Sequence, residues 1–314
     1  MAVFLVERGV LAAKIETVKG TANAPVAVDG GLEISDVSLN TDITVVERDP
    51  IAASFDDPKA IRGNRISRVT FKSPIVGGTT AGSRPPHWAL LRACGMTEAI
   101  SAGVSVTYTP TTASSTQETV TIDLYLDGIL HRIVGAMGTF RKTVAENDTP
   151  MFEFEFHGVY VAPSDTALLS GVAYQAVSPP APLGATLTFR SQTLVSTGWT
   201  FDLANSVVVR QDITQAGGVI HAVITNRKPV ITTDPEVELV ATFDFWSNVV
   251  NANSGEFNGT IGSAAGNTVR LLAPNAEITT AEPGDREGLR ILNLTLKPRR
   301  LTSAGNDFCT LRYT

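Results

Sequence analysis

Two pairs of carboxylates stand at spacings that could support acid–base chemistry. Asp123 and Asp127 lie in the segment TIDLYLDG, and Glu153 and Glu155 lie in MFEFEFHG. Both segments alternate in the manner of β-strands, so each pair is expected on one side of its sheet while the intervening apolar residues face the core. Such pairs could act as the acid and nucleophile of a glycosidase. The other two interpretations are a solvated polar face and a negatively charged lining inside a tube.

The sequence offers little else for catalysis. It contains no GxxxxGK[ST], no GxGxxG after a strand and no GxSxG. The histidines are scattered without metal-ligand spacing, at His87, His131, His157 and His221. The only cysteines, Cys94 and Cys309, are expected to be buried. The tryptophans that might stack on a sugar, Trp88, Trp199 and Trp246, show no grouping. The sequence therefore predicts no enzyme, no metal site and no cofactor site.

The charge balance bears on nucleic acid. With 25 Lys and Arg against 31 Asp and Glu, the net charge is −6, which argues against a protein that clamps phosphates but allows one that lets DNA pass by repulsion. Charged residues make up 18%, against about a quarter in average proteins. This shortage fits an ordinary β-sandwich and also a subunit covered by neighbours. The start, MAVFLVERGV, is too short in apolar residues for a signal peptide, so a cytoplasmic protein is expected.

β-Strand patterns dominate the elements that must carry these residues. In the first half we expect strands at 32–40, 43–48, 69–75, 104–108, 118–126, 129–134, 139–144 and 151–161. Asp127-Gly128 predicts a two-residue hairpin turn. A helix is expected over 85–95, with Pro86 in its first turn and Gly95 as its stop. Residues 11–31 are expected to form a short helical turn or an extended arm leading to a loop.

A charged stretch, ERDPIAASFDDPKAIRGNR, interrupts the first half at residues 47–65. A loop of this length inside a domain is uncommon unless it is functional. It is either a surface excursion or a protruding arm that docks on another subunit. The loop 47–66 carries the residues expected to make that contact, namely Glu47, Arg48, Asp49, Ile51, Phe55, Asp56, Asp57, Arg62 and Arg65.

Related patterns occur in both halves of the chain. TVVERD at 44–49 resembles SVVVRQD at 206–212, and GNR at 63–65 resembles TNR at 225–227. Each half ends in two strands around an acidic turn, at 138–161 and 275–298. We therefore expect a mainly β protein of two tandem β-sandwich or barrel-like modules with a short flanking helix, at 1–172 and 185–314, joined by the Pro-containing linker 173–184.

The strands expected in the second half follow a similar plan. They lie at 185–189, 198–203, 206–210, 219–224, 230–233, 237–246, 268–273, 276–280, 289–297 and 307–312. The Asn- and Gly-rich stretch 248–262 is expected to take the place of the helix of the first half.

Several segments together resemble the major tail tube proteins of long, non-contractile-tailed, siphovirus-type bacteriophages. They are VLAAKIETVKGTANAP with LEISDVSL and VVERDP, PHWALLRACGM with VTYTP, and VTIDLYLDGILHRIVGAMGTF with FEFEFHGVYVAP. The resemblance implies a non-enzymatic virion protein whose β-sandwich modules close into rings around a channel for genome DNA. In that family, residues 10–31 would match an N-terminal arm and 47–65 the long loop, both of which stack rings.

The resemblance also implies partners and a location. Two modules per chain would make a homotrimeric ring with pseudo-sixfold symmetry, with a homohexamer as the alternative. Tail terminator, tape-measure and distal tail proteins would be partners. Double-stranded DNA would pass through the channel without specific binding, and no membrane partner is expected. The protein would be assembled in the bacterial cytoplasm and end in the virion tail. Other candidates are a baseplate or decoration subunit and a carbohydrate-binding or hydrolytic β-sandwich.

Overall fold

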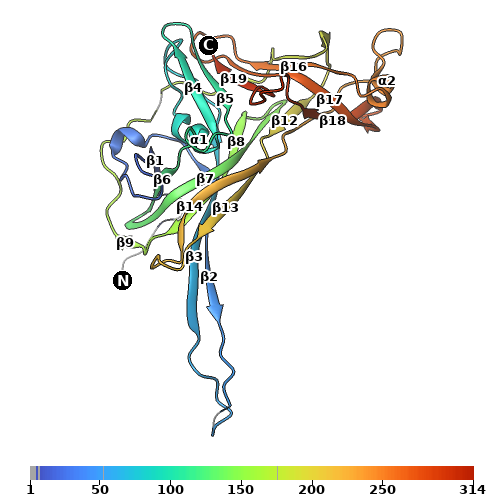
Figure 1. The fold of residues 1–314 in the computed structure, drawn as a ribbon. Coiled ribbons are helices and arrows are strands. Elements are labelled where there is room, and N and C mark those ends of the chain that lie inside the picture. Colours follow the sequence, from blue (N-terminus) through green and yellow to red (C-terminus); the bar gives the residue numbers. More distant parts are fainter. Residues whose placement is uncertain (1–4, 6–7, 52, 175) are drawn as a thin grey trace.

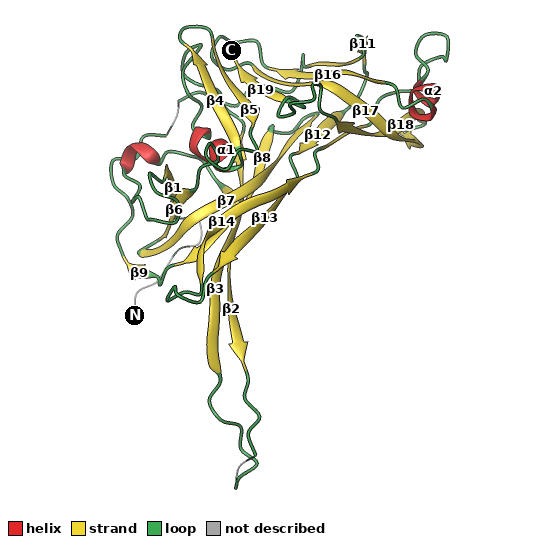
Figure 2. Cartoon of the chain, viewed as in Figure 1, coloured by secondary structure: helices red, strands yellow, loops and turns green. Residues whose placement is uncertain are grey.

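The computed structural model describes residues 5, 8–51, 53–174 and 176–314. Strands dominate it, with two short α-helices in this part of the chain (Figure 2). The first half contains β1 (Gly9–Ile15), β2 (Ser35–Val46), β3 (Ile61–Pro74), α1 (Trp88–Ala93), β4 (Met96–Ser101), β5 (Ser105–Pro110), β6 (Val120–Leu126), β7 (Ile129–Ala145), β8 (Met151–Tyr160) and β9 (Ser164–Asp165). The second half contains β10 (Thr186–Phe189), β11 (Gln192–Thr193), β12 (Gly198–Asp202), β13 (Asn205–Gln211), β14 (Val219–Arg227), β15 (Val230–Thr233), α2 (Phe245–Val250), β16 (Ser254–Ile261), β17 (Val269–Arg286), β18 (Leu289–Pro298) and β19 (Thr310–Tyr313).

The main core is one continuous apolar cluster that runs through both halves, and a smaller second cluster lies under the β13–β14 hairpin. Alternation along the strands builds it, because Phe152, Phe154 and Phe156 point inward from β8 while Glu153 and Glu155 point outward. Leu292, Leu294 and Leu296 do the same from β18. The mainly β fold expected from the sequence is therefore confirmed.

The same antiparallel order of strands occurs twice. In the first half the neighbours are β1–β6–β7–β8–β3–β2. In the second half they are β10–β16–β17–β18–β15–β12. Corresponding strands also occur in the same order along the chain. In each half a helix follows the third of these strands, α1 after β3 and α2 after β15.

Two strand pairings join the halves directly. The end of β7 pairs with β12, from Arg141 opposite Asp202 to Ala145 opposite Gly198. At the other side of the molecule β19 lies between β5 and β17. The sheet β2–β3–β8–β7 of the first half thus continues into β12–β15–β18–β17 of the second (Figure 1).

Local signals in the sequence were read correctly in several places. Asp127 and Gly128 both have positive φ and form the tight turn between β6 and β7. Helix α1 lies inside the predicted range, and Gly95 follows it at φ +75°, a conformation that glycine adopts without strain. Pairs of predicted strands merge into one. Strand β7 passes through residues 135–136 and β17 through residues 274–275 as bulges, and β2 pairs with β3 without a break from Asn40 to Ile43.

Two expectations were wrong. Residues 11–15 are not part of an arm, because β1 pairs with β6 along its whole length and buries Leu11 and Ala12 in the core. The expected helical turn occurs later in the same segment, as a 3-10 turn at Ala27–Asp29. The strand predicted at 237–246 is a loop that leads into α2, which Asp244 caps by accepting a hydrogen bond from the Ser247 N–H. The stretch 248–262, expected to take the place of the helix of the first half, holds the end of α2 and then the strand β16.

Candidate assembly surfaces

The β2–β3 hairpin projects as a long ribbon away from the body of the subunit (Figure 1). We call residues 41–66 of this hairpin the arm. Its strands pair as far as Val46 opposite Ile61, and residues 47–60 form the loop beyond them. Apart from Leu39 and Thr41, every residue of β2 is exposed. The loop tip carries Ile51 and Phe55 fully in solvent.

The candidate contact residues divide between the loop and a strand. Glu47, Arg48, Asp49, Ile51, Phe55, Asp56 and Asp57 lie in the loop, as predicted. Arg62 and Arg65 do not, because β3 begins at Ile61, and the two arginines extend from that strand. An apolar tip on an isolated two-stranded ribbon has no core of its own to enter, so it is a surface for another molecule.

A polar face covers the shared sheet on the side away from the core. It consists of Arg68 and Lys72 of β3, Glu153, Glu155 and His157 of β8, Arg141 of β7 and Asp202 of β12, with threonines between them. Part of this face forms an open hollow of about 680 Å³, lined by Lys72, Arg141, Glu153, Asp202 and their neighbours.

Opposite charges are paired across this face. Glu155 contacts Arg68 at 2.9 Å and His157 at 2.7 Å. Arg141 lies 3.0 Å from Asp202 and 4.0 Å from Glu153. Partial burial opposes ionisation of Glu155, but hydrogen bonds from His157 and Arg68 hold its pKa below the ordinary value. The face is thus a mixed lattice of charges on which both predicted glutamates are exposed or half-buried.

Asp123 and Asp127 do not join this face. Asp123 is fully buried and accepts two hydrogen bonds of 2.7 Å from Arg132 on the neighbouring strand. Asp127 lies in the β6–β7 turn, where it contacts Arg8 at 2.9 Å and accepts a hydrogen bond from the Leu5 N–H. The prediction that both aspartates lie on one side of a strand was wrong for Asp127, which lies beyond the end of β6. Asp123 does lie on the strand, but it is buried and is not part of a solvated face.

The shared sheet ends in two strands with an unpaired edge. Among the described residues β2 pairs only with β3. At the opposite end, residues 282–286 of β17 pair with β18 on one side and, within the part of the chain that the structure describes, with no strand on the other. Free edges of this length expose rows of backbone N–H and C=O groups and are sites for strand addition.

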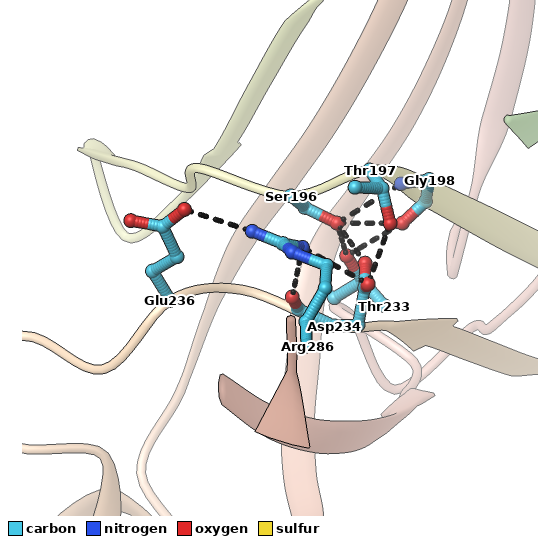
Figure 3. Close-up of polar contacts among 7 residues, drawn as sticks. All are labelled: Ser196, Thr197, Gly198, Thr233, Asp234, Glu236 and Arg286. Atoms are coloured by element: carbon cyan, nitrogen blue, oxygen red, sulfur yellow. Dashed lines mark hydrogen bonds and ion pairs between the residues drawn. The ribbon is translucent and has the colours of Figure 1, made fainter. Parts of the chain in front are cut away.

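A polar network holds the end of β17 that bears this free edge (Figure 3). Arg286 contacts Asp234 at 3.1 Å and Glu236 at 2.8 Å. Asp234 also accepts hydrogen bonds from the hydroxyls of Ser196 and Thr197, and the Thr233 hydroxyl donates to the Gly198 carbonyl. Partial burial opposes ionisation of Asp234, but these hydrogen bonds hold its pKa below the ordinary value. The network ties the β17–β18 hairpin to the start of β12 and the end of β15. Sequence reasoning missed it because its members are far apart in the chain.

Buried ionisable groups elsewhere serve the fold. Burial lowers the pKa of Lys142 to about 7 and that of His87 to about 3, so both side chains are in environments that favour the neutral form. Burial raises the thiol pKa of Cys94 and Cys309, as expected for structural rather than reactive cysteines. Trp199 is buried against Phe257, so it offers no platform for a sugar.

Two features are absent from the described residues. They contain no cluster of three or more His, Cys, Asp or Glu side chains arranged to hold a metal ion. They also contain no helix of the length and hydropathy needed to cross a bilayer.

Comparison with known proteins identifies the family of this chain. No curated protein matches the sequence. A family model described as phage tail tube protein matches residues 7–297, which is nearly the whole chain of 314. Proteins of this family are structural components of the virion tail rather than enzymes. Because this match covers nearly the whole chain, the protein belongs to the phage tail tube protein family.

Proposed function

We propose that the chain polymerises head to tail into rings, and that the rings stack into the tail tube through which genome DNA is delivered. The observation that carries this proposal is the β7–β12 pairing inside the chain, together with the two free edges of the same sheet. By its place in the repeated strand order, β17 corresponds to β7 and β2 to β12. The β17 edge of one copy is therefore suited to pair with β2 of the next, as β7 pairs with β12.

Head-to-tail contacts of this kind generate closed rings when the rotation between copies divides a full turn, and open helical filaments when it does not. Closure also removes both exposed edges, which would otherwise promote uncontrolled association. The network around Asp234 supports the proposal, because it holds residues 282–286 in place before a partner arrives.

The ring symmetry follows from the proposed tandem modules, with 1–172 and 185–314 joined by the linker 173–184. The repeated strand order and the equivalent positions of α1 and α2 support this duplication. Three chains would then supply six modules, so we propose a homotrimeric ring with pseudo-sixfold symmetry, and a homohexamer as the alternative.

The polar face is the proposed lining of the channel, with Glu153 and Glu155 as its candidate carboxylates. Asp123 and Asp127 are engaged with Arg132 and Arg8, which leaves the β8 pair for this role. Charge lattices that are already neutralised within the protein leave few cations free for phosphates, so DNA would slide without specific binding. Tape-measure, terminator and distal tail proteins are proposed partners of the tube.

Negative-stain microscopy of the purified protein, with native mass measurement of single rings, tests the proposal. Rings or tubes with a central hole and a mass of three chains are expected. A mass of six chains would reject the trimer but keep the ring, whereas dispersed monomers at all concentrations would reject assembly itself.

A further inference from the structure

One hairpin of the second half lies on the first half of the same chain. The β13–β14 hairpin packs Val207, Val209, Val219, Ala222 and Ile224 against Ile66, Met137 and Val159 of β3, β7 and β8. The Arg65 N–H donates to the Gly217 carbonyl at 3.1 Å near the hairpin tip. This docking follows directly from the β7–β12 pairing, because β13 continues the path of β12 (Figure 1).

Strand register identifies the corresponding surface of the second half. Phe154 pairs with Phe71 and Phe140, and Leu294 pairs with Thr233 and Ala281 in the same way. Counting along the strands from these anchors puts Lys228 in the place of Ile66 and Arg299 in that of Val159. Met137 lies opposite His157, three residues after Phe154, and Glu277 lies opposite Lys297, three residues after Leu294. The strand register therefore puts Glu277 in the place of Met137, beyond the bulge at Ile278 in β17. All three apolar residues of the acceptor surface are thus replaced by charged ones.

The same count identifies the corresponding part of the arm. Leu39 opposite Val69 matches Phe201 opposite Ile231, and Arg65 matches Arg227. The hairpin residues Val207, Val209, Val219, Ala222 and Ile224 then correspond to Val45, Glu47, Asp57, Ala60 and Arg62. Three of the five positions are again charged, on the surface that would meet the charged acceptor.

We infer that the arm of one copy docks on the charged surface formed by Lys228, Glu277 and Arg299 of the next copy in the ring. The inference rests on the proposed head-to-tail ring. Within a chain the contact is apolar on both sides, and between chains it is charged on both sides. A correlated change of both surfaces is what a contact between two copies requires, because a charge facing an apolar surface would lose its hydration without a partner.

The signs of the charges are complementary. The tip of β13–β14 lies next to Val159, since a Cβ on Gly217 would be 4.0 Å from the Val159 side chain. Asp57, near the equivalent tip, therefore faces Arg299, with Glu47 and Lys228 close by, while Arg62 is left for Glu277. Among the described residues Glu47, Asp57, Arg62 and Lys228 form no ion pair in the subunit and are exposed. The Ile51 and Phe55 tip extends beyond this contact and remains available to a stacked ring.

An ion-pair inversion tests this contact without unfolding the subunit. Glu277 and Arg299 contact each other at 2.7 Å, so Glu277→Arg with Arg299→Glu preserves their pair but inverts the charges offered to the arm. Like charges now face each other, and we expect about a tenfold higher protein concentration for half-assembly of rings. Asp57→Arg with Arg62→Glu in the same chain should restore assembly.

A matched control is the ion pair of Arg270 and Glu256, which lies in the same half but outside the proposed contact. Glu256→Arg with Arg270→Glu should assemble like the wild type, and thermal unfolding should show that all variants are folded. Two outcomes would overturn the docking inference alone, provided that the wild type forms rings. One is normal ring assembly of the Glu277→Arg, Arg299→Glu variant, and the other is a loss of ring assembly that Asp57→Arg with Arg62→Glu does not restore. Failure of the wild type to form any ring would overturn the proposed function and the inference with it.

Discussion

Lys142 is a lysine buried in the core. Its ammonium group is fully buried, lies 4.6 Å from the Trp199 ring centre and has no hydrogen-bond partner among the residues that the structure describes. Because burial lowers its pKa from 10.5 to about 7, the unfolded chain binds more protons than the folded one between these two values. Its contribution to the free energy of unfolding therefore rises with pH above about 7 and is lowest below it.

Lys142→Met should stabilise the subunit most below pH 7, since it replaces a buried cation by an apolar chain of similar length. The advantage over the wild type should shrink by about 1.4 kcal/mol per pH unit above 7. Chemical denaturation at pH 6, 7, 8 and 9 measures it. The exposed Lys297 provides the control, because Lys297→Met should give no pH-dependent difference. A constant gain from Lys142→Met at all four pH values would contradict the assigned titration.

Glu16 holds the N-terminal segment to the sheet. Its buried carboxylate accepts hydrogen bonds from the N–H groups of Gly20 and Gly135 and from the hydroxyls of Thr119 and Thr121. Glu16→Ala leaves these donors without their acceptor and should cost about 3 kcal/mol of unfolding free energy, measured by urea denaturation. The half-exposed Glu118, paired with Arg92, is the control and should cost less than about 1 kcal/mol. Equal effects of both changes would contradict this role of Glu16.

For single residues, the sequence predicted which side chains alternate along a strand better than it predicted which of them are buried. Alternation correctly predicted that Glu153 and Glu155 leave the core, because a strand puts successive side chains on opposite faces. It failed for Asp123, whose face is covered and whose charge is met by Arg132. A one-dimensional pattern does not contain the partner that makes burial of a carboxylate possible.

Among the elements, the arm is the one whose removal should separate folding from assembly. Deleting residues 55–60 removes the exposed Phe55 and Asp57 but no residue of the core. We expect an unchanged thermal unfolding curve and loss of tubes in negative-stain images. Val18→Ser, which changes another exposed apolar residue away from the arm, should leave the tubes intact. Normal tubes from the deleted protein would show that the loop does not dock.

The predictability of the elements depended on local signals. The Asp127-Gly128 turn and the range of α1 could be predicted because glycine and proline restrict the backbone at those positions. Helix α2 was missed although Asp244 is a good N-cap residue, since its apolar run, ATFDFWSNVV, also fits a strand. Segment 10–15 was assigned to an arm because its strand is formed by pairing with β6, more than 100 residues away.

For the whole molecule, the channel proposal makes a prediction about genome delivery. Glu153→Lys with Glu155→Lys adds cations to the proposed lining while leaving the core phenylalanines in place. Tubes should assemble, but ejection should slow because each lysine that contacts a phosphate increases DNA affinity through released counterions. Fluorescence of released DNA from purified particles measures the rate. Glu287→Lys, at the exposed β17–β18 turn, controls for added charge. Equal ejection rates for both variants would place the β8 glutamates outside the channel.

The pairings of β7 with β12 and of β5 with β19 also have a mechanical meaning. Backbone ladders shared by both halves resist shear between them, so each subunit should deform as a single stiff plate. The arm, in contrast, is a narrow two-stranded ribbon with little lateral support (Figure 1). Under a bending load the curvature of a tail should therefore concentrate at the joints between successive rings, which makes the tube a chain of rigid segments linked by elastic struts.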